Sequence, residues 1–284
     1  MDIVVLVKQV PNTTDVKLDK NTGNLIREGL ESIMNPDDRN ALEFALQIKA
    51  EYGGTITMVS MGPPQAVDVL SEAMGMGADK GLLLSDMAFA GADTWATSYT
   101  LGKAIEKIER FDLIICGRQA IDGDTAQIGP QVADFLDIPQ ITYVTDIETV
   151  SNKEVIVKRR LEDGHERVAS QLPALLTILG GANNPRYPNI GGLLAACEEN
   201  APLAAWNAAD IGVMVNDVGL AGSLTHVIKT YVPKFKRQGE TLEGTTAEVV
   251  RQLIQHLGKS EGASACKAVA ATCRLMADTK QEGI

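Results

Sequence analysis

Short apolar runs rich in β-branched residues alternate with segments of helical periodicity through the first half of the chain. The apolar runs cover residues 3–7, 55–60, 81–84, 113–116 and 141–144. The helical patterns cover residues 37–52, 65–74, 94–108 and 125–136. This alternation is typical of βαβ units that build a parallel sheet with helices on both faces. The sequence therefore predicts an α/β fold with a doubly wound, mainly parallel, Rossmann-like sheet.

The pattern changes in the second half of the chain. Residues 154–160 alternate, Asp163–Gly164 is a turn signal, and residues 166–170 can return as a partner strand, which predicts a β-hairpin extension. Residues 175–179 indicate one more strand, and the segment 180–192, rich in glycine and proline, indicates a surface loop. We expect an α/β domain over residues 1–230, followed by a C-terminal arm with one amphipathic helix over residues 231–284.

Charge and cysteine usage exclude several functional classes. The 284 residues carry a formal net charge of −11, which disfavours nucleic-acid binding because phosphate contacts need a basic face. The apolar run near the amino terminus is too short for a signal peptide or a membrane span, so we expect a cytoplasmic protein. The four cysteines lack CxxC spacing, and the three histidines lie far from them, so we expect no metal site. The sequence also lacks a convincing set of catalytic side chains.

The residues that follow the predicted strands are the first candidates for a binding site, because ligands of parallel sheets bind beyond the carboxyl ends of the strands. The most informative of these segments is Gly117–Thr125. A helix that begins near Gly123, Asp124 and Thr125 would present free backbone N–H groups to a phosphate. The alternative is that Asp124 or Thr125 merely caps this helix. Asp37 and Asp38 are likewise typical first-turn charges of a helix that Asn35 could cap.

Five stretches of the chain carry a family resemblance. They are VKQVP at 7–11, MNPDD at 34–38, SMGPPQA at 60–66, MGADKG at 76–81 and GRQAIDGDTAQIGPQVADFLDIPQ at 117–140. Together they resemble the β subunit of electron transfer flavoproteins over roughly residues 1–235. The last stretch is similar to the loop that wraps the phosphate of AMP, or of the adenosine half of FAD, in that family. The resemblance implies a heterodimer with an α subunit.

The resemblance also implies the residues that hold the cofactor. Adenine and ribose contacts would come from Leu6, Asn35, Asp37, Asp38 and Met61. Phosphate contacts would come from Ala120 to Gln131, chiefly Asp122, Gly123, Thr125, Gln127 and Gly129. The full set of implied cofactor-binding residues also includes Val7, Lys8, Asp93, Thr94, Thr97, Cys116, Ala120, Asp124, Ala126, Ile128, Pro130 and Gln131.

A further segment narrows the subtype. SDMAFAGADTWATSYTLGKAI at 85–105 is similar to the segment of flavin-bifurcating members, which hold FAD in the β subunit and accept hydride from NADH. Met87 departs from the basic residue expected in this motif. This subtype implies NADH oxidation only within a complex, with electrons passing to ferredoxin and to a flavin dehydrogenase of acyl-CoA or hydroxy-acid type. The alternatives are a simple electron shuttle that holds structural AMP and a stand-alone adenine-nucleotide-binding protein.

Two segments are implied to bind protein partners. NPRYPNIGG at 184–192 falls where the family has its recognition loop for dehydrogenases, which implies partner contacts from Arg186, Tyr187, Pro188, Asn189 and Ile190. Residues are missing from this loop between Tyr187 and Pro188, compared with the family. The basic stretch 234–237 lies in the arm that would embrace the α subunit, and the alternative there is a solvated linker.

Overall fold

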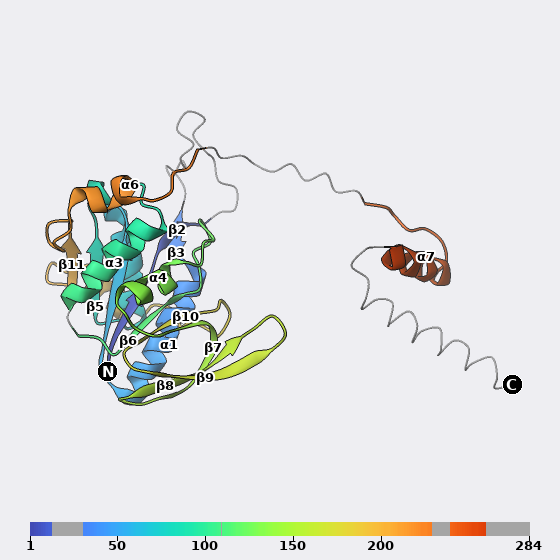
Figure 1. The fold of residues 1–284 in the computed structure, drawn as a ribbon. Helices are drawn as coiled ribbons and strands as arrows, with labels where there is room; N and C mark the ends of the chain where they lie inside the picture. Colours follow the sequence, from blue (N-terminus) through green and yellow to red (C-terminus); the bar gives the residue numbers. More distant parts are fainter. Residues whose placement is uncertain (13–30, 109, 229–238, 260–284) are drawn as a thin grey trace. The chain divides into compact units, whose positions relative to one another are not determined.

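The computed structural model describes residues 1–12, 31–108, 110–228 and 239–259. The chain divides into two compact units, residues 1–230 and 231–284 (Figure 1). The basic stretch 234–237 lies outside the described residues. Within the part that is described, every helix is too short or too polar to cross a bilayer.

A nine-stranded sheet forms the centre of the first unit, in the order β11-β5-β4-β1-β6-β10-β7-β8-β9. Its strands are β1 (Asp2–Leu6), β4 (Thr55–Met61), β5 (Lys80–Leu84), β6 (Leu113–Gly117), β7 (Gln140–Val150), β8 (Glu154–Arg160), β9 (His165–Gln171), β10 (Ala174–Ile178) and β11 (Leu203–Trp206). Strand β8 pairs antiparallel with both of its neighbours, and every other pair in this sheet is parallel. The short strands β2 (Gln9–Pro11) and β3 (Ser32–Met34) form a separate antiparallel pair.

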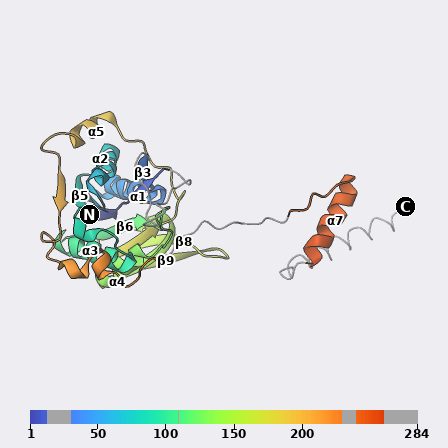
Figure 2. The ribbon, with the colours of Figure 1, turned by 90° about the horizontal axis from the view of Figure 1, so that it is seen from above.

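Helices cover both faces of this sheet, as Figure 2 shows from above. The first unit contains α1 (Pro36–Tyr52), α2 (Val67–Met76), α3 (Thr94–Ile108), α4 (Ile128–Phe135), α5 (Ile190–Ala196) and α6 (Gly219–Gly222), with 3-10 turns η1 (Pro64–Ala66), η2 (Met87–Phe89) and η3 (Val215–Asp217). The second unit contains α7 (Thr246–Lys259). Helices α1 and α2 pack in one core cluster, and α3 and α4 pack in the other. The predicted doubly wound α/β class with a hairpin extension is confirmed.

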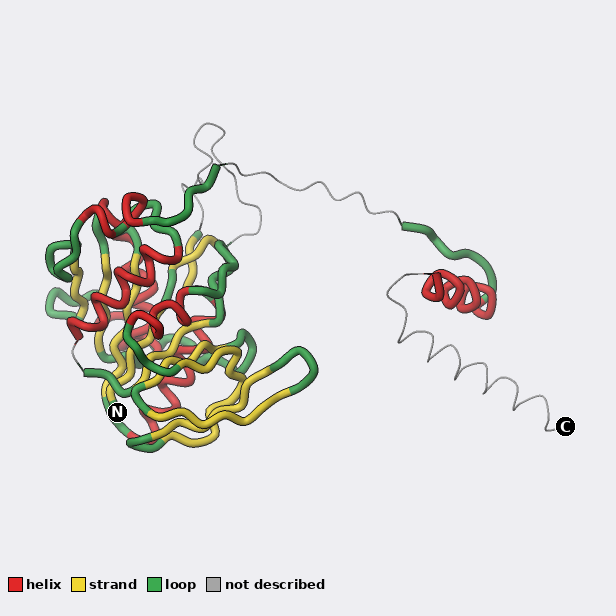
Figure 3. Tube along the Cα trace, viewed as in Figure 1, coloured by secondary structure: helices red, strands yellow, loops and turns green. Residues whose placement is uncertain are grey.

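Alternate residues of β1 explain why both faces need helices. Ile3 and Val5 belong to the core cluster of α1 and α2, whereas Val4 and Leu6 belong to the cluster of α3 and α4. A strand that is apolar on both sides is stable only when both sides are covered. Figure 3 shows the strands of the sheet, in yellow, with helices packed around them.

The predicted helix over residues 125–136 begins three residues later than expected. Helix α4 starts at Ile128, because Asp124 and Ala126 have left-handed backbone conformations, with φ of +49° and +54°. Such residues interrupt a right-handed helix. Thr125 therefore lies in a loop before the helix, and the prediction that the helix starts there is wrong.

The direction in which strands are added to the sheet reverses at one position, between β1 and β6. From β1 the chain builds outward through β4 and β5, and then β6 returns to the other side of β1. Ligands of open α/β sheets bind outside the carboxyl ends of the strands at such a reversal. In this protein the reversal lies between the carboxyl ends of β1 and β6, which Leu6 and Gly117 occupy.

Candidate functional site

The loop 118–127 leaves β6 at the reversal and is fastened at its start by buried groups. The Arg118 N–H donates to the Ile178 carbonyl oxygen over 2.7 Å. Asn35, which is fully buried, donates from Nδ2 to the Gln119 carbonyl oxygen (2.9 Å) and accepts from the Ile121 N–H at Oδ1 (3.1 Å). Asn35 precedes α1, yet its side chain makes no cap bond. The Asn35 side chain, which the sequence suggested as a helix cap, therefore holds the loop 118–127 and does not cap α1.

Further side chains close the loop on itself and on β1. The Lys8 ammonium forms an ion pair with the Asp122 carboxylate over 2.7 Å. Gln119 donates from Nε2 to Asp124 Oδ1 (2.8 Å), and the Asp124 N–H donates to the Ala120 carbonyl oxygen (2.9 Å). The loop is thus preformed rather than open.

The second half of this loop offers a series of backbone donors. The N–H groups of Gly123, Thr125, Ala126 and Gln127 donate to no acceptor among the described residues. Left-handed Ala126 is followed by right-handed Gln127, with φ −103° and ψ −26°. Such alternation forms an anion-binding nest, and the first N–H groups of α4 add to it because no helical acceptor faces them. The residues present therefore fit a phosphate group.

The two acidic residues in the first turn of α1 are turned toward backbone. Asp38 accepts from the Lys8 N–H at Oδ2 (2.8 Å) and from the Gly117 N–H at Oδ1 (2.9 Å), so it joins the ends of β1 and β6. A Cβ at Gly117 would lie 2.3 Å from Asp38 Oδ1, which only glycine avoids. Burial raises the pKa of Asp38 to about 7, although these hydrogen bonds oppose the shift. Its contact with adenine or ribose stays a prediction.

Asp37 faces the start of the loop that follows β10. Its Oδ2 lies 3.5 Å from Arg118 Nε, and a Cβ at Gly180 would lie 2.3 Å from its Oδ1. Burial raises the pKa of Asp37, and Arg118 opposes this. The Arg118 guanidinium also lies over the ring of Tyr143, 6.0 Å from its centroid. Arg118 lies in the segment Gly117–Thr125 that the sequence indicated, but it was assigned no contact there. Tyr143 was not a candidate, because no sequence signal indicates its left-handed backbone (φ +58°).

The start of α3 lies against the end of the loop. Thr94 donates from Oγ1 to Gln127 Oε1 (2.9 Å), and Ser98 donates from Oγ to Gln131 Oε1 (3.0 Å). Asp93 instead points toward Thr225, which donates to Asp93 Oδ2. The structure therefore brings Thr94, Gln127 and Gln131 together, as sequence reasoning expected of one site.

The remaining predicted cofactor residues differ in accessibility. Leu6, Val7 and Cys116 are buried, whereas Met61 at the end of β4, Thr97, Ile128 and Pro130 are partly buried. Gly129 is buried, and a Cβ there would lie 2.7 Å from Thr177 Cγ2 and 2.9 Å from Cys116 Sγ. Burial raises the pKa of the Cys116 thiol. These positions shape the base of the site. Among the described residues, no three His, Cys, Asp or Glu side chains are grouped to hold a metal ion.

Comparison with known proteins identifies the family. The sequence matches the family model described as "Electron transfer flavoprotein domain" over residues 22–211, more than half of the chain. The chain belongs to the electron transfer flavoprotein family. The resemblance that the sequence motifs carry is thereby confirmed.

The chain matches relatives in the electron transfer flavoprotein family over almost their whole length. The chain is 51% identical over 259 residues to the caffeyl-CoA reductase-Etf complex subunit CarD of Acetobacterium woodii, covering 90% of this chain and 98% of the relative. It is 51% identical over 257 residues to the electron transfer flavoprotein subunit beta of Thermoanaerobacterium thermosaccharolyticum, with the same coverage. It is 42% identical over 262 residues to the acryloyl-CoA reductase electron transfer subunit gamma of Anaerotignum propionicum, again with 90% and 98% covered.

The segment that the resemblance implies to be the partner-recognition loop is held on α1 and α2. Arg186 donates from Nε and Nη2 to the two carboxylate oxygens of Glu43, both over 2.9 Å. Asn189 donates from its N–H (2.8 Å) and Nδ2 (2.7 Å) to the Gly75 carbonyl oxygen. Pro188 is partly buried, whereas Tyr187 and Ile190 are 89% and 76% exposed. Of the five implied contact residues, Tyr187 and Ile190 therefore present apolar side chains to solvent, while Arg186 and Asn189 hold the loop in place.

Proposed function

We propose that this chain is the β subunit of an electron transfer flavoprotein that binds FAD at the loop 118–131 and acts as a heterodimer with an α subunit. The observation that carries the proposal is the preformed nest of free N–H groups at residues 123–127, placed before α4 and at the reversal of strand order. In the proposed complex, electrons pass from NADH to a low-potential acceptor such as ferredoxin and to a partner flavin dehydrogenase or reductase.

The residues of the chain have distinct roles in this proposal. The N–H groups of the nest and of the start of α4 bind the pyrophosphate, with help from the Thr125 hydroxyl. The Lys8 ammonium lies over the loop through its ion pair with Asp122 and adds positive charge near the phosphates. Met61 and Leu6 supply apolar surface for the adenine ring. The bound flavin would supply hydride and single-electron chemistry, which the side chains position and tune.

The position of α3 favours FAD over AMP. Residues 91–94 (GADT) belong to the segment that resembles FAD-holding members. They lie next to the loop 118–127, because Thr94 donates a hydrogen bond to Gln127. AMP would end at the phosphate nest and would not extend to this second segment. Structural AMP in a simple electron shuttle remains the second candidate, since the nest by itself fits any phosphate.

Two further surfaces are proposed to bind proteins. The exposed side chains of Tyr187 and Ile190 are proposed to contact a flavin dehydrogenase or reductase. The names of two relatives refer to caffeyl-CoA reductase and acryloyl-CoA reductase, which favours a partner that acts on an acyl-CoA. The second unit, residues 231–284, is proposed to be the arm that contacts the α subunit, and the complex is proposed to work in the cytoplasm.

The test is to measure the nucleotide content of the chain purified with its α subunit. The bound nucleotides are released by denaturation, separated by chromatography and counted per heterodimer. Two FAD and no AMP would support the proposal, and NADH-dependent ferredoxin reduction would then be assayed. One FAD and one AMP would show a simple electron shuttle. A monomer that binds ATP and forms no heterodimer would favour a stand-alone nucleotide-binding protein.

A further inference from the structure

Asp93, at the start of α3, has both carboxylate oxygens occupied by donors of the protein itself. Oδ1 accepts from the Ala96 N–H over 3.0 Å, which caps the first turn of the helix. Oδ2 accepts from the N–H and the hydroxyl of Thr225, both over 2.9 Å. A carboxylate with three donors of its own has little capacity left for a ligand. This occupancy separates Asp93 from its neighbour Thr94, whose hydroxyl faces the loop 118–127.

The partner of Asp93 belongs to a segment, residues 219–225, that is seated on the turn before α3. The Ser223 hydroxyl accepts from the Asp93 N–H (2.8 Å) and donates to the Gly219 carbonyl oxygen (2.7 Å). The Leu220 N–H donates to the Ala90 carbonyl oxygen over 3.0 Å. Gly219 has φ +57°, and a Cβ there would lie 1.9 Å from the Ala88 carbonyl oxygen. The fit is therefore close and leaves no room for a shift without loss of these bonds.

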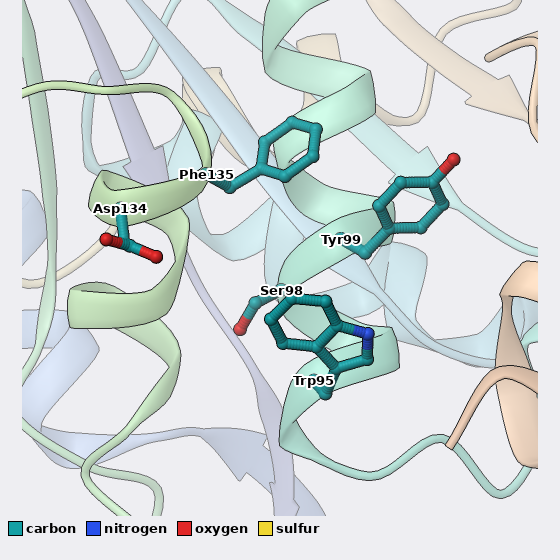
Figure 4. A pocket seen from close by; sticks show the side chains of 5 residues that line it. All are labelled: Trp95, Ser98, Tyr99, Asp134 and Phe135. Carbon is teal, nitrogen blue, oxygen red and sulfur yellow. The ribbon is translucent and has the colours of Figure 1, made fainter. Parts of the chain in front are cut away.

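Helix α3 is in turn packed tightly against α4. A Cβ at Gly102 would lie 2.2 Å from Phe135 Cδ1, and the rings of Tyr99 and Phe135 meet edge to face at 5.6 Å. Figure 4 shows the side chains of Trp95 and Tyr99 on α3 facing those of Asp134 and Phe135 on α4. The hollow that they line has a volume of only about 40 Å³. A displacement of α3 would therefore be transmitted to α4 and to Gln127 at its start.

We infer that Asp93 is a positioning residue of the nucleotide site, which acts by seating residues 219–225 on α3 and so fixing α3, α4 and the phosphate loop in one arrangement. This inference rests on the proposed function, because it requires that the loop 118–131 binds a nucleotide. It differs from the ligand contact that the family resemblance implies for Asp93. The segment 219–225 becomes part of the site although it lies far from the loop in sequence.

The experiment compares Thr225→Val, which removes the hydroxyl donor, with Thr225→Ser, which keeps it, and with Asp93→Asn. The full chain is purified with its α subunit, and the rate of release of bound FAD or AMP is measured after dilution into an excess of a competing nucleotide. We expect Thr225→Val and Asp93→Asn to release nucleotide roughly tenfold faster, since a hydrogen bond to a charged group is lost. Thr225→Ser should release nucleotide at the wild-type rate.

A matched control separates positioning from general loss of stability. Thr145 on β7 donates to the Lys158 carbonyl oxygen on β8, so Thr145→Val removes one threonine hydroxyl bond outside α3 and outside residues 219–225. Thermal unfolding of all variants is recorded, and Thr145→Val should leave the release rate unchanged. The double variant Asp93→Asn with Thr225→Val should be no faster than Asp93→Asn alone, because both changes remove one contact.

Three results would overturn the inference. Faster release from Asp93→Asn together with wild-type release from Thr225→Val would mean that Asp93 contacts the nucleotide directly. Wild-type release from both variants would mean that the contact between Asp93 and residues 219–225 does not position the loop 118–131. The proposed function would remain intact. If the wild-type complex itself binds neither FAD nor AMP, the proposed function is wrong and the inference falls with it.

Discussion

Two buried carboxylates on α1, Asp38 in its first turn and Glu43 farther along, hold different parts of the chain, and their pKa values are shifted in opposite directions. Asp38 joins the ends of β1 and β6, from which the loop 118–127 leaves, whereas Glu43 holds the loop 180–192. Asp38 is 6% exposed and accepts hydrogen bonds from the backbone N–H groups of Lys8 and Gly117. Glu43 is 5% exposed and faces the Arg186 guanidinium. Burial raises the pKa of Asp38 to about 7. Burial also tends to raise the pKa of Glu43, but hydrogen bonds from Arg186 more than offset this and lower it.

The loops 118–127 and 180–192 also differ in the groups that they expose to a ligand or a partner. The loop 118–127 is fastened through polar side chains at its start and leaves its later backbone donors free, which suits a small anionic ligand. The loop 180–192 is fastened through the side chains of Arg186 and Asn189 and exposes apolar side chains, which suits a protein surface. One helix thus supports a proposed nucleotide site and a proposed docking loop with independent anchors.

The largest effect on this comparison is expected from Arg186→Ala. The substitution leaves Glu43 buried without its cation, which should lower the free energy of unfolding by roughly 3 kcal/mol. Chemical denaturation at pH 7 measures this change. Arg186→Lys keeps the charge but loses the paired geometry, so it should cost about 1 kcal/mol. Nucleotide content should stay at the wild-type level, and its loss in Arg186→Ala would show that the two anchors are not independent.

The pH dependence of stability should separate the two carboxylates. The pKa of Asp38 is raised in the folded protein above its value in the unfolded chain, so its contribution to stability is fully present at acidic pH and is lost as the pH rises through about 7. Between pH 5 and pH 8, the wild type should lose roughly 2 kcal/mol of unfolding free energy relative to Asp38→Asn, which does not titrate. The pKa of Glu43 is lowered, so Glu43→Gln should shift stability uniformly over the same range. Parallel curves for wild type and Asp38→Asn would contradict the expected titration.

Gly123→Val tests the nucleotide side of the comparison. A Cβ at this position meets no atom within 4 Å, so the folded chain should tolerate the side chain. The valine would block close approach of a phosphate to the backbone, and we expect cofactor affinity to fall by roughly 100-fold, about 2.7 kcal/mol. Titration of the heterodimer with FAD and with AMP measures it. Wild-type affinity for both would place the phosphate elsewhere.

A smaller effect on cofactor binding than that of Gly123→Val is expected from Thr125→Ala. Loss of one hydroxyl that donates to a charged acceptor should weaken cofactor binding by about 1.5 kcal/mol, roughly tenfold. Thr125→Ser is the matched control and should retain wild-type affinity in the same titration. If Thr125→Ala and Thr125→Ser bind alike, the hydroxyl does not contact the phosphate. Neither variant should change the stability of the loop 180–192.

Much of the fold could be predicted from the sequence because local patterns agreed with the tertiary arrangement. Helix α3 occupies the predicted residues 94–108, and β8 occupies the predicted residues 154–160. Pro36 opens α1 and Gly77 closes α2 with φ +124°, as their types indicate. Strand β11 was missed, because its four residues, LAAW, show no alternation and form the edge strand of the sheet, which pairs only with β5.

The sequence indicated where the candidate site lies, but it did not indicate which residues its side chains bind within the protein. Motif similarity drew attention to Asn35, Asp93 and Arg186, all as contacts to a ligand or a partner. Those contacts stay predictions, and what the structure adds is that Asn35 holds Gln119 and Ile121. It also shows that Asp93 binds Thr225 and that Arg186 binds Glu43. Such pairings join residues far apart in the chain, and no local pattern encodes them.

The sequence by itself determined the alternation of strands and helices, the loop after β6 with its small and polar residues, and the family. These follow from periodicity, turn residues and motifs, which act over short distances along the chain. Only the tertiary structure decided that β6 returns beside β1, that Asp124 and Ala126 take left-handed conformations, and which side chains hold each loop. The physical reason is that strand order and buried hydrogen bonds depend on the packing of the whole core, which selects one arrangement among many that are locally compatible.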